Sequence, residues 1–133
     1  MRVLLDTNVL IHREAATVVR GDIGTLFNWL DRLRYEKCIH PASIREIANH
    51  EDPRVRATIK AKLSSYHELK TLAALQREVA AAGAGDETPN DRNDTLLVNE
   101  LFAGRVDLLI SEDRGIARKA AQLGIGDRVF TID

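Results

Sequence analysis

The chain has 133 residues, 44% of them hydrophobic and 29% charged, a balance typical of a globular protein, so we expect one domain over residues 1–133. Its formal net charge of −1 excludes the strongly basic character of a protein that binds nucleic acid indiscriminately, although it allows a local basic rim. Cys38 is the single cysteine and excludes an internal disulfide, so we expect a cytoplasmic protein. No apolar stretch is long enough to span a bilayer, so we expect no membrane partner.

In the first part of the chain, short apolar runs alternate with stretches in which apolar residues recur every three or four positions. The runs predict buried strands, and the periodic stretches predict helices. In chain order they are a strand over 2–6, a helix from 7 or 8 to 13, a helix over 21–36, a strand over 38–40 and a helix that starts near Pro41 and ends before Asp52.

Residues 54–82 favour helix throughout, but one helix of that length would exceed the usual globular range. We therefore expect a break near Ser64-Ser65 or Lys70-Thr71. Residues 83–93 are rich in turn formers and predict a surface loop. The remaining predicted elements are a helix over 94–102, a strand over 107–111, a helix over 114–123 and a strand over 128–132. Strands that alternate with helices predict a parallel sheet covered on both faces, a three-layer α/β/α sandwich.

Four acidic residues stand where this topology would bring them to one edge of the sheet. Asp6 closes the first strand, and Asp113 follows the strand over 107–111. Asp94 opens a predicted helix, and Glu46 lies on the helix after the second strand. Because carboxylates at the carboxyl ends of parallel strands form an oxygen-rich hole suited to Mg²⁺ or Mn²⁺, they predict metal-assisted hydrolysis of a phosphodiester.

Each of these residues also fits an ordinary structural role. Asp6 and Asp94 suit helix caps, Asp113 suits a solvated turn, and Glu46 suits a solvated helix position. Joint placement favours a site more than any single residue does. Four basic residues flank the acids and are either phosphate contacts or simply solvated: Arg92, Arg114, Arg118 and Lys119.

Histidine and tryptophan are poorer candidates for functional groups in this chain. The four histidines lack the close spacing of a zinc site, so we expect them at the surface or at its boundary. Trp29 lies just off a helical stripe, which favours a core position over a platform for stacking nucleic-acid bases.

Three segments together resemble the PIN-domain nuclease family: Leu-Leu-Asp-Thr-Asn-Val-Leu at 4–10, Asp-Thr-Leu-Leu at 94–97 and Leu-Ile-Ser-Glu-Asp-Arg-Gly at 109–115. The resemblance covers nearly the whole chain. It implies a parallel α/β/α sandwich and Mg²⁺- or Mn²⁺-dependent cleavage of single-stranded RNA, in a toxin or in RNA processing. The partners it leaves open are an antitoxin and a further domain of a longer protein. Apart from the resemblance, a homodimer is also left open.

The resemblance also assigns roles to individual residues. It implies that three aspartates hold the metal, namely Asp6, Asp94 and Asp113. Glu46 would complete the catalytic set as a fourth acid. Asn8 and Ser111 would support the acids through hydrogen bonds.

Two other functional classes remain as alternatives. One is a non-catalytic binding or regulatory module that keeps the acids without turnover. The other is a phosphatase of the haloacid-dehalogenase type, which also places an aspartate after its first strand. That chemistry needs a second aspartate two residues on, where this chain has Asn8, so it ranks below the others.

Overall fold

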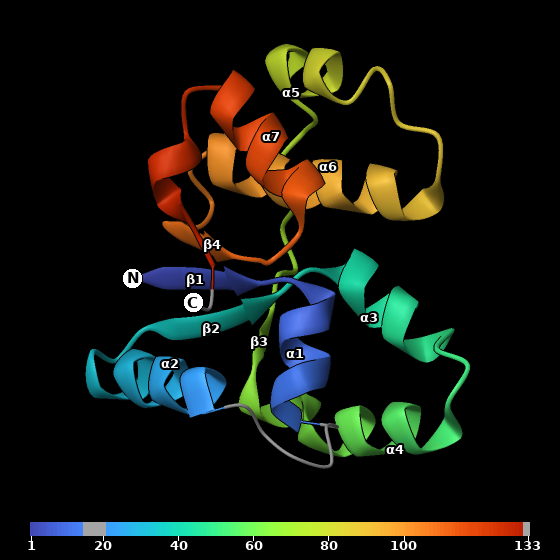
Figure 1. Cartoon of the computed structure of the whole chain (residues 1–133), viewed down its shortest axis with the longest axis vertical. Coiled ribbons are helices and arrows are strands. Elements are labelled where there is room, and N and C mark those ends of the chain that lie inside the picture. The colour runs from blue at the N-terminus through green and yellow to red at the C-terminus, as the bar shows by residue number, and fades with distance from the viewer. Residues whose placement is uncertain (15–20, 132–133) are drawn as a thin grey trace.

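The computed structural model describes residues 1–14 and 21–131, in which five parallel strands form one sheet in the order β3-β2-β1-β4-β5 (Figure 1). The strands are β1 (Arg2–Leu5), β2 (Glu36–Ile39), β3 (His67–Glu68), β4 (Leu108–Ile110) and β5 (Val129–Phe130). The α-helices are α1 (Thr7–Glu14), α2 (Gly21–Arg32), α3 (Pro41–Ala48), α4 (Pro53–Lys62), α5 (Arg77–Ala82), α6 (Pro89–Phe102) and α7 (Arg114–Gln122).

Helices cover both faces of this sheet, so the predicted three-layer α/β/α sandwich is confirmed. In Figure 1, α1 to α4 lie on one side of the strands and α5 to α7 on the other. Strand β1 is central, and its residues alternate between the two cores. Leu4 packs in a cluster with Leu109 on the α6–α7 side, whereas Val3 and Leu5 pack in a cluster with Phe27 on the α2 side. Burial on both faces explains why β1 is an unbroken apolar run.

The predicted loop over 83–93 is partly wrong, because α6 begins at Pro89 and not at Asp94. The Thr88 hydroxyl accepts a hydrogen bond from Asp91 N at 3.1 Å, and the Asp91 carboxylate accepts one from Thr88 N at 3.3 Å. This reciprocal pair is a capping box, and Pro89 suits the first helical position because its missing N–H would have no partner there. Asp94 therefore lies in the second turn of α6 and is not its cap.

The helix-favouring stretch over 54–82 does break near Ser64-Ser65, but the chain after the break is not the second helix that the prediction implied. A short 3₁₀ helix over Leu63–Ser65 leads into β3, and α5 starts only at Arg77. Strand β3 is two residues long and is defined by its pairing with β2, in which Cys38 faces His67 and Ile39 faces Glu68. Such a strand leaves no periodic signal in the sequence.

Several other boundaries shift by a few residues. Helix α2 ends at Arg32 rather than 36, because the chain turns through Arg34, whose φ of 59° lies in the left-handed region. Strand β2 can then start at Glu36. The last strand is shorter than predicted, and residue 132 of that prediction lies outside the described residues. No helix in residues 1–14 and 21–131 has the length and hydropathy needed to cross a membrane.

Candidate functional site

The four predicted acids lie at the carboxyl edge of the sheet, beside the neighbouring strands β1 and β4. The chain leaves β1 toward the α1 side and leaves β4 toward the α7 side (Figure 1). Where neighbouring parallel strands send their connections to opposite faces, a crevice opens at their carboxyl ends. Asp6 directly follows β1, and Asp113 is the residue that caps α7 after β4.

Asp6 is buried at this edge of the sheet and is only 6% exposed. Its carboxylate accepts hydrogen bonds from Thr7 N at 2.7 Å and from the Ser111 hydroxyl at 2.7 Å. Burial raises the pKa of Asp6 above its ordinary value, the two hydrogen bonds oppose that rise, and the charges of Asp113 and Glu46 add to it. The site therefore places a desolvated carboxyl beside like charges.

Ser111 ties two of the acids together. Its hydroxyl donates to Asp6 and also accepts a hydrogen bond from Asp113 N at 3.0 Å. Asp113 in turn accepts from Ile116 N at 3.1 Å, so it is an N-cap of α7 as well as a member of the cluster. The structural and the functional interpretations of Asp113 are therefore compatible.

Glu46 on α3 and Asp94 on α6 complete the cluster from the other side. Asn93 donates from its side-chain amide to Glu46 Oε1 at 2.7 Å, which joins the two helices next to Asp94. Burial first, and then the charges of Asp6, Asp113 and Glu46, raise the pKa of Asp94 to about 8, while the charge of Lys119 opposes that rise. Four carboxyl groups from four segments of the chain thus repel one another.

Asn93 is the site residue that sequence reasoning missed. The turn-rich composition assigned it to the loop over 83–93, and its partner Glu46 lies 47 positions away in the chain. The capping box at Thr88 was the available signal, because it would have placed Asn93 on α6 beside Asp94.

The donor chemistry of this cluster fits a hard divalent cation, since every candidate ligand is a carboxylate oxygen. A cation would also relieve the repulsion that adds to the pKa of Asp94. Within the described part of the chain, however, no three His, Cys, Asp or Glu side chains lie close enough together to hold a metal ion as they stand. The carboxylates that could provide ligands are Asp6, Asp94 and Asp113.

The structure corrects the interpretation of Lys119 as a phosphate contact. Its side chain is only 3% exposed, and its ammonium group lies 2.8 Å from Asp86 Oδ1. It also donates to the Thr95 hydroxyl at 2.8 Å and to the Asp91 carbonyl at 3.1 Å. Lys119 therefore joins α7 to the start of α6 and has no donor left for a substrate.

The three arginines predicted beside the acids are exposed, namely Arg92, Arg114 and Arg118. Arg114 lines a hollow of about 430 Å³ together with Asp6, Asp113 and His12. Asn8 lines the same hollow, but it is exposed and its side chain forms no hydrogen bond with another described residue. It therefore faces the open space and does not brace an acid in the way that Ser111 does.

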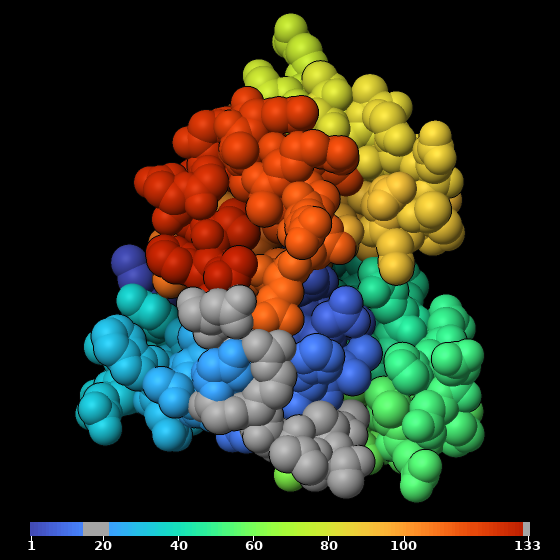
Figure 2. All heavy atoms as spheres, viewed as in Figure 1, coloured from blue at the N-terminus to red at the C-terminus, as the bar shows by residue number. Residues whose placement is uncertain are grey.

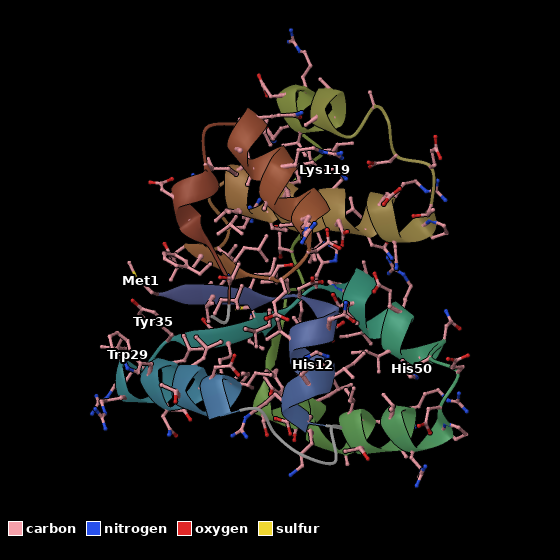
Figure 3. All side chains as sticks on the ribbon, in the orientation of Figure 1. Met1, His12, Trp29, Tyr35, His50 and Lys119 are labelled. Atoms are coloured by element: carbon pink, nitrogen blue, oxygen red, sulfur yellow. The ribbon has the colours of Figure 1, made fainter. Side chains whose placement is uncertain are left out.

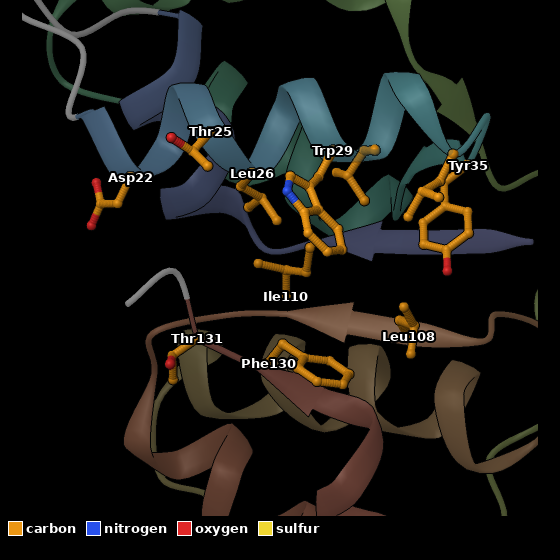
Figure 4. A pocket seen from close by; sticks show the side chains of 11 residues that line it. Asp22, Thr25, Leu26, Trp29, Tyr35, Leu108, Ile110, Phe130 and Thr131 are labelled. Carbon is orange, nitrogen blue, oxygen red and sulfur yellow. The ribbon is translucent and has the colours of Figure 1, made fainter.

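Two further expectations are wrong. Trp29 is 62% exposed and not in the core; Figure 4 shows its ring over an apolar hollow of about 620 Å³, between α2 and the strands β4 and β5. His40 is 2% exposed rather than at the surface. Its Nδ1 accepts a hydrogen bond from Ala42 N at 2.9 Å and caps α3. Burial, with a smaller contribution from Arg45, lowers the pKa of His40 to about 4.

Comparison of the chain with protein-family models finds no match, and comparison with curated proteins finds none either.

Proposed function

We propose that this protein is a divalent-metal-dependent endoribonuclease that hydrolyses phosphodiester bonds of single-stranded RNA, in a toxin-type or RNA-processing role. The observation that carries the proposal is the gathering of four acidic side chains at the carboxyl edge of the sheet, where Asp6 and Asp113 are joined through Ser111 and Glu46 is joined to α6 through Asn93. Their charges, after burial, contribute to the rise in the pKa of Asp94 to about 8. Like charges held together at the carboxyl edge of a sheet are costly in an empty site and are relieved by a cation. The resemblance of the sequence to PIN-domain nucleases points to the same chemistry.

Each acid has a role that follows from its contacts. Asp6, Asp94 and Asp113 would hold Mg²⁺ or Mn²⁺, which when bound would polarise a phosphodiester oxygen and acidify a water. Ser111 fixes Asp6 and the backbone of Asp113 relative to each other. Asn93 occupies Glu46 Oε1, so the second oxygen of Glu46 is the one that would accept a proton from the attacking water.

The test is cleavage of labelled single-stranded RNA by the full chain. Cleavage should require Mg²⁺ or Mn²⁺ and stop when a chelator is added. Asp6→Asn and Asp94→Asn should each lower the rate by about 100-fold or more, because each removes a charge that holds the ion. Asp127→Asn is the matched control, since Asp127 is exposed and precedes β5, at the opposite edge of the sheet. Cleavage that persists unchanged in either site variant would defeat the proposal.

A second candidate function is a non-catalytic binding or regulatory module of a larger protein or complex. The observation in its favour is that the described residues contain no ready-made metal-binding group of three side chains. RNA binding without metal-dependent cleavage, in preparations whose fold is verified by circular dichroism, would favour this candidate over the nuclease.

A further inference from the structure

A polar groove of about 580 Å³ lies next to the acidic cluster, where α1, α3 and the start of α6 meet. In Figure 2, the first turns of α6 (yellow) lie directly above α3 (green), with α1 (blue) beside them. Figure 3 shows His50 just after α3 and His12 on α1. Carboxamide side chains dominate the lining, which includes Asn8, Asn49, Asn90 and Asn93 as well as Arg45 and His50.

Most of these carboxamides are available to a ligand. Asn8, Asn49 and Asn90 are exposed, and within the described residues none of their side chains forms a hydrogen bond. Only Asn93 is engaged, through its bond to Glu46. Three free carboxamides around one hollow present adjacent donors and acceptors in a region where the protein itself does not need them.

The lining of the groove also includes one buried polar residue. Thr7 lines the groove and is only 6% exposed. Its hydroxyl oxygen is buried and has no hydrogen-bond partner among the described residues. Because that oxygen is itself closed to solvent, the exposed carboxamides and not this hydroxyl are the groups that a ligand in the groove would meet.

The groove is continuous with the acidic cluster. Glu46 lines it, and Asn8 lines both this groove and the hollow that contains Asp6 and Asp113. A nucleotide with its phosphate at the acids would therefore have its base or a neighbouring base in the groove. The groove also lacks an aromatic ring of Phe, Tyr or Trp among its lining residues, so hydrogen bonding to base edges is the main form of recognition that it offers.

We propose that this groove binds one unpaired nucleobase next to the scissile phosphate and recognises its edge through Asn49 and Asn90; the inference rests on the proposed ribonuclease function. A carboxamide offers a donor and an acceptor side by side, which complements the edges of bases. The Watson–Crick edge of a base is open only in single strands, where bases are free of pairing. The His50 imidazole and the Arg45 guanidinium are the lining groups that can stack on the base plane.

The experiment combines protein variants with RNA from which the base has been removed. Binding of short fluorescein-labelled single-stranded RNA to the full chain is followed by fluorescence anisotropy in EDTA, and cleavage of the same RNA is followed in Mn²⁺. Asn49→Ala and Asn90→Ala are compared with Asn28→Ala, a change of the same kind at an exposed position on α2. Each RNA is also made with single abasic nucleotides at successive positions.

Wild-type binding should weaken by about 5- to 150-fold when the abasic nucleotide occupies one particular position. Asn49→Ala and Asn90→Ala should each weaken the binding of intact RNA by a similar factor. Removal of the base at that position should then weaken the affinity of these two variants only slightly further. Asn28→Ala should behave as wild type. The inference is overturned if both variants bind intact RNA as tightly as wild type does, or if they weaken binding equally with and without the base.

The assay separates failure of this inference from failure of the nuclease proposal. Cleavage that is metal-dependent but insensitive to the abasic nucleotides and to both variants overturns the inference and leaves the nuclease intact. Binding that depends on the base and on Asn90, without any cleavage in Mn²⁺, supports the groove and overturns the nuclease.

Discussion

Asp94→Asn should stabilise the metal-free protein at alkaline pH while it abolishes the proposed activity. The pKa of Asp94 is about 8 in the folded protein, against an ordinary value of 3.8, through burial and then repulsion from Asp6, Asp113 and Glu46. The folded state therefore keeps this proton to a higher pH than the unfolded chain does. The stability linked to Asp94 is complete below the ordinary pKa and is lost as the pH rises through the folded value.

The size of the effect can be worked out from the same two values. The difference between the ordinary pKa of 3.8 and the folded pKa of about 8 corresponds to a loss of at most about 6 kcal/mol in the free energy of unfolding, at a pH above both values. Asp94 is only partly buried, however, and solvent screens it from its neighbours, so we expect about 1–2 kcal/mol. For a chain of this size that is a rise in Tm of about 3–10 °C.

The measurement is the free energy of unfolding by urea, in EDTA, for wild type and Asp94→Asn across the pH range. The two proteins should be most alike near pH 3.5, below the ordinary pKa of Asp94, where the residue is largely protonated in both the folded and the unfolded chain. The variant should be the more stable near pH 9. Asp127→Asn should track wild type. If the difference between Asp94→Asn and wild type is the same at both ends of the range, the carboxylates do not repel as inferred. In the absence of EDTA, Mn²⁺ should stabilise wild type more than the variant.

Three further changes test other parts of the structure. Lys119→Met should lower the free energy of unfolding by about 3–5 kcal/mol, because it leaves the Asp86 carboxylate without its buried partner; a loss below about 1 kcal/mol in urea unfolding would contradict that pairing. Ser111→Ala should lower the free energy of unfolding by about 1–3 kcal/mol, because the Asp6 carboxylate loses the hydroxyl donor at 2.7 Å. Isothermal titration with Mn²⁺ should also show weaker metal binding by this variant than by wild type. Thr88→Ala should lower the free energy of unfolding by about 1 kcal/mol, because α6 loses its N-cap. An unchanged melting temperature by circular dichroism would argue against the capping box.

The sequence by itself predicted the elements whose signals are local. The apolar run before Asp6 makes a central strand because both of its faces are buried, and the periodic residues of 114–123 make α7. Alternation of such elements was enough for the three-layer sandwich. It also placed Asp6 and Asp113 at one edge, because neighbouring parallel strands end on the same side of a sheet.

Tertiary contacts decided what local signals do not contain. Strand β3 exists through its pairing with β2, and the pair of Asn93 with Glu46 joins two helices far apart in the chain. Lys119 is buried although a lysine is expected at the surface, and Trp29 is exposed although a tryptophan is expected in the core. A helical stripe shows which residues lie on the same side of a helix, but burial also depends on what lies opposite. Asp86 lies opposite Lys119, while Trp29 stands over the hollow beside β4 and β5.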